Sequence, residues 1–454
     1  MHSRLRTTLA TTAAAALTGG LLTGGLLIAG AGSAAAATAK YSDDFNGDGY
    51  RDYAYSGSAT DAGSDVSGTV GIIYGTAAGP YGRAQNITQN SAGVPGSNEG
   101  EDGFGITMTG ADFNRDGYAD LAVGSPGETV NGHRHQGAVT ILWGSAAGLS
   151  GGTVVPNKDA RTWGVFGDDL ASGDFNGDGK PDLAVINNHT AQVYRGTFSK
   201  SGFSGTVTKL TRDDLFAEHL VAGKVTKDAA ADLVVVGGVD GPSHTLTGAW
   251  FIRGGSTLTR GATLKLGTGE DSSFAVSGTV ADFNKDGYGD IALGQPLADG
   301  EKGAVIVWRG GSSGPGSTTK LTQNTSGVTG TSENGDWFGH DLSAGDVNHD
   351  GYPDLAVSAV GEDLGKYADA GAVHILRGSS QGLSGTRSQW FELATTGVPG
   401  DPEANSSFGS SLRLRDSDRD GYADLFTDYL RFKGSANGIT VTGIQSSIRP
   451  GFLP

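Results

Sequence analysis

The sequence predicts an all-β fold, a seven-bladed β-propeller of four-stranded antiparallel blades. A nine-residue pattern, Asp-x-Asn-x-Asp-Gly-x-x-Asp, recurs with spacings of 50 to 70 residues along a chain of 454 residues. Each copy has the same apolar and glycine-rich surroundings. After the N-terminal segment, no stretch keeps the apolar period of about 3.6 residues that is typical of amphipathic helices.

The repeat is the element that decides the architecture, because a fixed sequence period indicates a repeat fold. A Phe-Gly or Phe-Ala pair lies upstream of six copies, at Phe104, Phe166, Phe216, Phe274, Phe338 and Phe408. Six intact copies begin at Asp44, Asp112, Asp174, Asp282, Asp346 and Asp416, and a degenerate copy begins at Lys224. The chain therefore contains seven structural units.

Each unit reads as four short strands. In the second unit an apolar run follows the pattern at residues 121–123, and a polar loop leads to a glycine-led strand at residues 137–142. A turn and a further extended segment complete the unit, as residues 83–88 do in the first. Four strands without a helix predict one antiparallel sheet per unit, and seven such sheets arranged radially make a propeller. We expect residues 438–445 to form an outer strand, but the sequence does not say which chain end closes the ring.

Residues 1–37 are expected to be a secretory signal peptide. Arg4 and Arg6 precede an apolar run, which ends in small residues that suit an A-x-A cleavage site. The alternative is a membrane anchor. With cleavage, residues 38–454 form the propeller domain of a secreted, extracellular protein with no membrane span.

Composition excludes several classes of function. The chain has no cysteine, which removes disulfides, thiolate metal sites and cysteine nucleophiles. Its formal net charge is −17, and so acidic a protein is not expected to bind nucleic acid. Two G-x-S-x-G matches, around Ser312 and Ser380, fall at strand-to-strand turns, whereas a nucleophile elbow joins a strand to a helix.

The nine-residue pattern has the chemistry of a calcium loop. Ca²⁺ takes oxygen ligands, and glycine at position 6 permits a sharp turn. Positions 1, 3, 5 and 9 offer side-chain oxygens, and position 7 offers its backbone carbonyl. The predicted ligands are Asp44, Asn46, Asp48, Tyr50 and Asp52; Asp112, Asn114, Asp116, Tyr118 and Asp120; Asp174, Asn176, Asp178, Lys180 and Asp182; Asp282, Asn284, Asp286, Tyr288 and Asp290; Asp346, Asn348, Asp350, Tyr352 and Asp354; and Asp416, Asp418, Asp420, Tyr422 and Asp424. We therefore expect about six Ca²⁺ ions per chain.

The fourth unit departs from this pattern. Lys224 stands at position 1, and only Asp228 and Asp232 keep their carboxylates. We predict no metal there and expect the Lys224 ammonium to lie between the two acids in place of an ion.

The repeated pattern and its Phe-Gly pairs resemble the FG-GAP repeat family, known from the integrin α-subunit propeller and from exported bacterial proteins. The resemblance covers essentially all of residues 38–454. It implies a seven-bladed β-propeller with calcium-binding hairpin loops. It leaves the function open, because one fold hosts many roles.

Function is expected on the face opposite the calcium loops, where the variable loops gather. The candidate ligand-binding residues are His133, Arg134, Trp337 and Tyr367. The first hypothesis is a monomeric binding or adhesion module for an extracellular protein or glycan. The alternatives are a hydrolase or polysaccharide lyase on the same propeller, which needs one asymmetric cluster of acids, His and Arg, and a lectin, which needs repeated aromatics in equivalent loops. No catalytic residue is predicted.

Overall fold

The computed structural model describes residues 38–57, 68–79, 82–239, 246–268, 277–428 and 430–446. The expected signal peptide, residues 1–37, lies outside these ranges and stays a prediction. Phe274 and large parts of two predicted variable loops, 56–67 and 237–247, also lie outside them.

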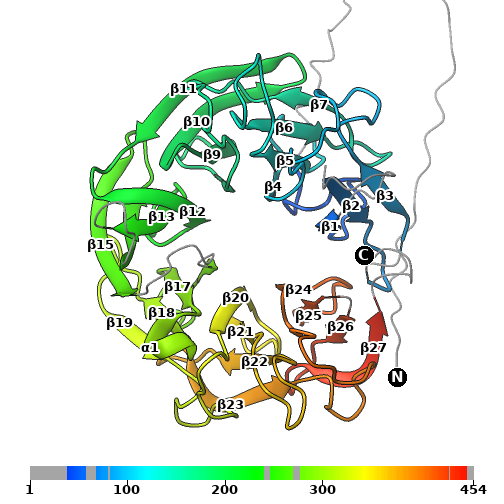
Figure 1. Ribbon diagram of the computed structural model, residues 1–454, viewed down its shortest axis with the longest axis vertical. Coiled ribbons are helices and arrows are strands. Elements are labelled where there is room, and N and C mark those ends of the chain that lie inside the picture. Colours follow the sequence, from blue (N-terminus) through cyan, green and yellow to red (C-terminus); the bar gives the residue numbers. More distant parts are fainter. Residues whose placement is uncertain are drawn as a thin grey trace, which may run out of the picture. The chain divides into compact units, whose positions relative to one another are not determined.

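The described chain forms seven antiparallel sheets arranged as the blades of a propeller (Figure 1), which confirms the predicted fold class. The strands of blades 1 to 3 are β1 (Tyr53–Gly57), β2 (Thr69–Ile73) and β3 (Ala84–Ile87); β4 (Met108–Ala111), β5 (Asp120–Ser125), β6 (Ala138–Trp143) and β7 (Ser150–Val154); and β8 (Leu170–Gly173), β9 (Asp182–Asn187), β10 (Thr190–Ser199) and β11 (Gly202–Leu210). Those of blades 4 and 5 are β12 (Leu215–Gly223), β13 (Asp232–Val239), β14 (Leu246–Arg253) and β15 (Thr259–Thr268); and β16 (Gly278–Ala281), β17 (Asp290–Gln295), β18 (Ala304–Trp308) and β19 (Thr318–Leu321). Those of blades 6 and 7 are β20 (Phe338–Gly345), β21 (Asp354–Ala359), β22 (Ala372–Arg377) and β23 (Ser384–Phe391); and β24 (Leu412–Arg415), β25 (Asp424–Thr427), β26 (Leu430–Lys433) and β27 (Thr440–Ser446).

The first blade has three strands, where the sequence predicted four. Residues 38–43 occupy the place before its hairpin loop but form no strand, and the Asp52 amide donates to the Asp43 carbonyl (2.7 Å). The Ala39 amide donates instead to the Asp112 carboxylate of the second blade (2.8 Å). This segment therefore contacts both its own blade and blade 2 without adding a fourth strand.

The ring closes without an exchange of strands. β27 is the outer strand of blade 7, as residues 438–445 were predicted to be, and it pairs with β26 of the same blade. Blade 1 is built only from strands β1, β2 and β3. Among the described residues, neither chain end supplies a strand to the other blade.

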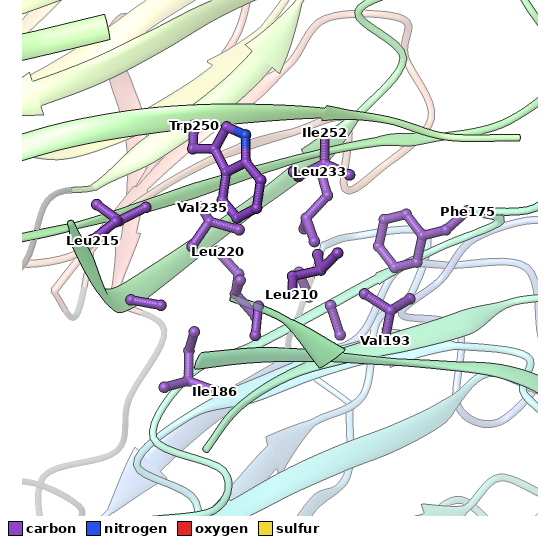
Figure 2. Close-up of a cluster of buried hydrophobic side chains, with 14 of the residues drawn as sticks. Phe175, Ile186, Val193, Leu210, Leu215, Leu220, Leu233, Val235, Trp250 and Ile252 are labelled. Carbon is purple, nitrogen blue, oxygen red and sulfur yellow. The ribbon is translucent and has the colours of Figure 1, made fainter. Parts of the chain in front are cut away.

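The hydrophobic core lies between neighbouring blades. Figure 2 shows the cluster between blades 3 and 4, where Phe175, Ile186 and Val193 meet Leu233 and Trp250. Five further clusters join the other neighbours from blade 1 through blade 7 in chain order. Burial of these side chains is the main driving force for packing blade on blade.

The seam between blades 7 and 1 is different, because none of these clusters of described residues spans it. Tyr53 stacks on Phe426 with ring centroids 6.0 Å apart. Arg415 pairs with Asp43, and the Arg431 guanidinium donates to the Ala78 carbonyl (3.1 Å). Polar and aromatic contacts therefore replace the apolar core at this junction.

Strand register defines two faces of the propeller. Ala111 pairs with Asp120, so residues 112–119 form a hairpin loop at one end of β4 and β5. The turn between β6 and β7 lies at the same end, since the Gly144 amide donates to Asp120 (2.8 Å). We call this end, which carries the nine-residue loops, the loop face. The opposite end, which carries the connections between second and third strands such as residues 126–137 and 361–371, is the variable face.

The described part of the chain includes one helical segment, α1 (Ala298–Glu301), in the variable connection of blade 5. It is a single irregular turn, because Asp299 and Gly300 have left-handed φ values of 57° and 74°. No helix in this part of the chain is long and apolar enough to cross a membrane.

Candidate metal centres and the opposite face

The hairpin loop of blade 2 shows how the backbone holds the predicted ligands. The Asp116 amide donates to Asp112 Oδ1 (3.0 Å) and to Asn114 Oδ1 (2.8 Å). The Gly117 amide donates to Asp112 Oδ2 (3.1 Å), and the Tyr118 amide donates to Asp116 Oδ1 (3.1 Å). Each predicted side-chain ligand at positions 1, 3 and 5 is thus oriented by amides of its own loop.

The same network recurs around the ring. The amide at position 6 donates to the position 1 carboxylate in the loops that begin at Asp44, Asp174, Asp282, Asp346 and Asp416. The amide at position 7 donates to the position 5 carboxylate in those loops as well. The sequence therefore builds six loops of one design, in which backbone amides orient the carboxylates at positions 1 and 5.

The aspartate at position 9 has a second role that the sequence did not reveal. Asp120 is buried; its Oδ2 accepts from the Phe113 amide (2.9 Å), and its Oδ1 accepts from the Gly144 amide (2.8 Å). Burial, and then repulsion from Asp116 and Asp112, raise the pKa of Asp120 to about 7 despite these bonds. The carboxylate ties the loop to the end of the third strand.

Blade 4 separates this structural role from metal binding. Asp232 keeps the position 9 contacts, accepting from the Val225 amide (3.1 Å) and the Gly254 amide (2.9 Å). Arg253, from the third strand, pairs with Asp228 (2.9 Å). The expectation that Lys224 is the internal cation was wrong, because the Arg253 guanidinium reaches Asp228 across the sheet.

Unpartnered oxygens support a cation at two loops. Asp44 Oδ1, Asp416 Oδ1 and Asp418 Oδ1 are buried and have no hydrogen-bond partner. Asp228 Oδ1 in blade 4 shares this property, but the other oxygen of that carboxylate pairs with Arg253. Asp416, Asp418 and Asp420 each offer a carboxylate oxygen, and these oxygens lie within 4.8 Å of one another. A cluster of three acids with unused buried oxygens can hold a metal ion, since an unmatched buried charge is costly.

The hairpin loop of blade 7, which we call loop 7, is also paired with cations from its own blade. The buried Arg431 guanidinium pairs with Asp418 and Asp424 (2.7 Å each), and Lys433 pairs with Asp418 (2.8 Å). Burial alone would raise the pKa of Asp418, but Lys433 and Arg431 outweigh it and lower that pKa below its usual value. Loop 7 is thus partly neutralised by the protein itself.

Neighbouring loops also touch through position 4, which the sequence reading did not single out. Lys227 lies over the Tyr288 ring of the next loop (4.0 Å), Lys285 lies over Tyr352 (4.9 Å), and Arg419 lies over Tyr50 (3.9 Å) across the seam. These contacts could have been predicted from the sequence, because a basic residue at position 4 of one copy is followed by a tyrosine at position 7 of the next copy. These cation–π contacts link successive loops.

On the variable face, the predicted residues His133 and Arg134 lie in an aromatic and charged cluster between blades 2 and 3. Trp163 stacks on His135 with centroids 4.2 Å apart, and Arg134 lies over the Trp163 ring (5.4 Å). Arg134 and His135 both approach Glu101, at 3.5 and 3.8 Å. We call Glu101, His133, Arg134, His135 and Trp163 the Trp163 cluster.

The other two predicted residues lie in blade 6. Trp337 comes directly before β20 with a left-handed φ of 53°. Tyr367 is half-buried in the connection between β21 and β22, beneath Lys366 (4.8 Å to the ring centroid). No contact of the described residues brings either one to His133 or Arg134, so the four candidates do not form one site.

Fold and loops together define a β-propeller with acidic hairpin loops on one face. Residues 104–142, 166–197, 274–308 and 338–376 match the FG-GAP repeat family. With seven blades and the repeated loops, the chain is an FG-GAP repeat β-propeller, related to integrin α subunits and to phosphatidylinositol-glycan-specific phospholipase D.

Individual relatives share only part of their length with it. Human phosphatidylinositol-glycan-specific phospholipase D is 34% identical over 152 residues, 29% of this chain and 18% of that enzyme. Integrin α-3 of Cricetulus griseus is 34% identical over 209 residues, 44% of this chain and 18% of the integrin. Integrin α-5 of Xenopus laevis is 32% identical over 222 residues, 47% and 20% respectively. The chain thus spans a fifth or less of these relatives.

A solved structure of an Agrocybe aegerita lectin, titled for its recognition of non-reducing terminal N-acetylglucosamine, covers 83% of this chain and 85% of its own, with 12% identity and a TM-score of 0.44. A likeness at this level carries no argument about ligands.

Proposed function

We propose that the protein is a secreted binding module, stabilised by calcium in its six intact hairpin loops, whose variable face binds an extracellular protein or glycan through the Trp163 cluster. The observation that carries this proposal is the conformation and exposure of Trp163. Its φ is 60° and the residue is 58% exposed.

Comparison between blades makes Trp163 stand out. The residue three positions before the Phe-Gly pair has a positive φ in four blades, where it is Glu101, Trp163, Gly335 or Asn405. The backbone contact is also shared, since the Trp163 amide donates to the Arg134 carbonyl (2.9 Å) and the Asn405 amide to the Ala368 carbonyl (2.8 Å). Left-handed backbone suits Gly and Asn, and a bulky side chain there costs energy. An exposed tryptophan in that conformation is retained for something other than folding.

The neighbours of Trp163 favour recognition. The Arg134 and Glu101 side chains are 64% and 69% exposed. Tryptophan and arginine dominate binding energy at interfaces, because they combine a large apolar area with directional polar groups. The equivalent positions beside Asn405 carry Ala368 and Asp369, so the junction between blades 6 and 7 lacks this feature.

The test compares wild type with Trp163→Asn, which copies the residue of blade 7. Both proteins are applied to a glycan array and used as bait against secreted proteins, and unfolding is followed in parallel. We expect the variant to lose the ligands that wild type retains while its stability does not fall. A matched control, Trp337→Asn, alters another left-handed tryptophan outside the cluster and should keep those ligands. Identical ligand profiles for all three proteins would refute the role of the cluster.

A second candidate function, a hydrolase, is favoured by the same asymmetry, because the cluster brings Glu101, His135 and Arg134 together. Exposure argues for binding, since catalytic groups work best when water is excluded and their geometry is fixed. A screen of ester and glycoside substrates with wild type and His135→Ala separates the two. Turnover that disappears in the variant would establish the enzyme.

A further inference from the structure

The residue at position 4 of a hairpin loop connects that loop to the next one around the ring; we number all hairpin loops by their blades. Lys285, from loop 5, lies over the Tyr352 ring of loop 6 (4.9 Å), and its Nζ donates to the Asp350 carbonyl (3.4 Å). Asp350 and Tyr352 stand at positions 5 and 7, where loop 6 offers two of its predicted calcium ligands. One side chain therefore contacts two ligand-bearing residues of the neighbouring loop.

Three further boundaries between loops repeat this arrangement. In each, the position 4 side chain lies against the position 7 ring and within hydrogen-bond distance of a backbone carbonyl at position 5 or 6 of the next loop. The contacts are Lys227 with Tyr288 and the Asp286 carbonyl (4.0 and 2.6 Å), His349 with Tyr422 and the Gly421 carbonyl (5.7 and 2.6 Å), and Arg419 with Tyr50 and the Asp48 carbonyl (3.9 and 3.4 Å). The contacts therefore run without a break from loop 4 through loops 5, 6 and 7 to loop 1, where position 4 is Gly47.

Loop 3 lacks the contact on both sides. Its own position 4 is Gly177, which has no side chain to reach loop 4. Loop 2 has Arg115 at position 4, but position 7 of loop 3 is Lys180, and no cation–π contact among the described residues joins Arg115 to loop 3. Loop 3 is therefore the internal control for the linked loops.

Position 4 lies between two predicted ligands of its own loop. In loop 5 these are Asn284 and Asp286, and the Asp286 amide donates to Asn284 Oδ1 (2.9 Å). Lys285, between them, has a left-handed φ of 58°. An ion ligated by the side chains on both sides fixes this turn, and with it the direction in which the lysine leaves the loop.

We propose that the position 4 side chains couple calcium binding among loops 5, 6, 7 and 1. An ion in one loop fixes the position 4 residue, which then holds positions 5 to 7 of the next loop in the conformation that binds calcium. The coupling rests on the proposed binding of calcium by the hairpin loops. Because coupling between two sites is reciprocal, an ion in loop 6 also raises the affinity of loop 5. Lys227 differs, since loop 4 is expected to hold no ion, and it positions loop 5 at every calcium concentration.

The positive charge of these side chains does not produce the coupling. A lysine near a loop repels Ca²⁺ and lowers its affinity, but it does so whether the preceding loop is filled or empty. Coupling is measured by how strongly the affinity of one loop depends on the occupancy of its neighbour.

The experiment titrates the full chain with Ca²⁺ in a calorimeter and compares two variants that each lose one position 5 ligand. Asp178→Ala, in the isolated loop 3, should lose one site and leave the other affinities unchanged. Asp286→Ala, in loop 5, should lose one site and weaken a second site by about fivefold or more, because loop 6 no longer has a filled neighbour. If both variants keep five sites of unchanged affinity, the coupling is refuted while calcium binding stands. A wild-type chain that binds no calcium would overturn both proposals.

Variants at position 4 test the contact itself. Lys285→Met keeps every predicted ligand, so it should retain the wild-type number of sites. We expect it to abolish the dependence of loop 6 on loop 5, so that adding Asp286→Ala to it removes one site and weakens no other. Lys285→Arg should restore the dependence, because a guanidinium can also lie over Tyr352 and donate to the Asp350 carbonyl. A dependence that survives in Lys285→Met would show that this side chain does not carry the coupling.

Discussion

Arg431 is a cation built into the candidate metal loop of blade 7, and its removal should make this blade more dependent on calcium. It is fully buried, and it pairs with Asp418 and Asp424 and donates to the Ala78 carbonyl across the seam. Replacing Arg431 by Met leaves the buried Asp424 without an ion pair and leaves Asp418 with Lys433 as its only cation among the described residues. Breaking such a pair costs about 3–5 kcal/mol of unfolding free energy.

Calcium should recover part of that loss. Asp418 and Asp424 stand at positions 3 and 9 of the loop, so without the guanidinium they are free to ligate an ion. With a Kd near ~10⁻⁴ M and ~2 mM calcium, one site adds about 1.8 kcal/mol to the folded state. Because Arg431 occupies two of the ligands, calcium binds this loop more weakly in wild type than in the variant. We therefore expect Arg431→Met to lose about 3–5 kcal/mol in EDTA and, in the limit of little wild-type binding, about 1–3 kcal/mol in calcium.

Urea unfolding of wild type and variant, each in EDTA and in calcium at matched ionic strength, measures both values. Arg413→Met is the control in the same blade, because its pair with Asp341 is 3.6 Å long and its side chain is 47% exposed. An exposed pair contributes at most about 1 kcal/mol. An equal loss for Arg431→Met in EDTA and in calcium would refute the idea that guanidinium and metal compensate the same carboxylates.

Three further results are expected. Elemental analysis of protein dialysed against calcium should return about six ions from the hairpin loops, and a total of three or fewer would contradict the expectation that all six loops bind calcium. Burial lowers the pKa of His374, packed between Phe338 and Trp390, to about 3. The unfolded chain gains this proton near pH 6.5, so stability should fall by up to about 1.4 kcal/mol per pH unit between 6.5 and 3. His374→Ile should flatten that dependence in thermal melts, and identical slopes would show that other groups cause it. Arg253→Met should lose at most about 1 kcal/mol of unfolding free energy, because its pair with Asp228 is partly exposed. The loss should be the same with and without calcium. A loss that calcium reverses would mean that blade 4 binds metal.

The sequence predicts the blades well because each blade is a local unit. The Asp-x-Asn-x-Asp-Gly pattern contains its own turn and ligands within nine residues, and the strands pair with their neighbours in the chain. Arg253 and Arg431 could not be foreseen in the same way. They come from the third strand and reach the loop across the sheet, so no local spacing marks them.

The seam between blades 7 and 1 and the variable face contain further features that the sequence alone did not predict. Closure joins residues at opposite ends of the sequence, such as Arg415 and Asp43, and no repeat period relates them. The significance of Trp163 rests on its left-handed φ of 60°. Residue type alone does not predict this backbone conformation, because tryptophan rarely adopts it. His133 and Arg134 were predicted from composition of a loop, whereas their partners Trp163 and Glu101 precede two different blades.

The nine-residue pattern serves both the folding of the blade and the proposed binding of a metal ion, and comparison of the blades separates these two roles. The fold needs the position 9 aspartate, since Asp232 keeps its backbone contacts even in the blade whose other ligands are lost. Positions 1, 3 and 5 supply the predicted metal ligands, and the chain treats the negative charge of their acids in three ways. Blade 2 keeps the acids and has no cation paired with Asp116, blade 7 keeps them beside Arg431, and blade 4 retains one acid, Asp228, and pairs it with Arg253. A covalently attached guanidinium needs no free ion and cannot be chelated. The blades are therefore expected to differ in how strongly calcium stabilises them, with blade 4 insensitive, blade 7 intermediate and blade 2 most dependent.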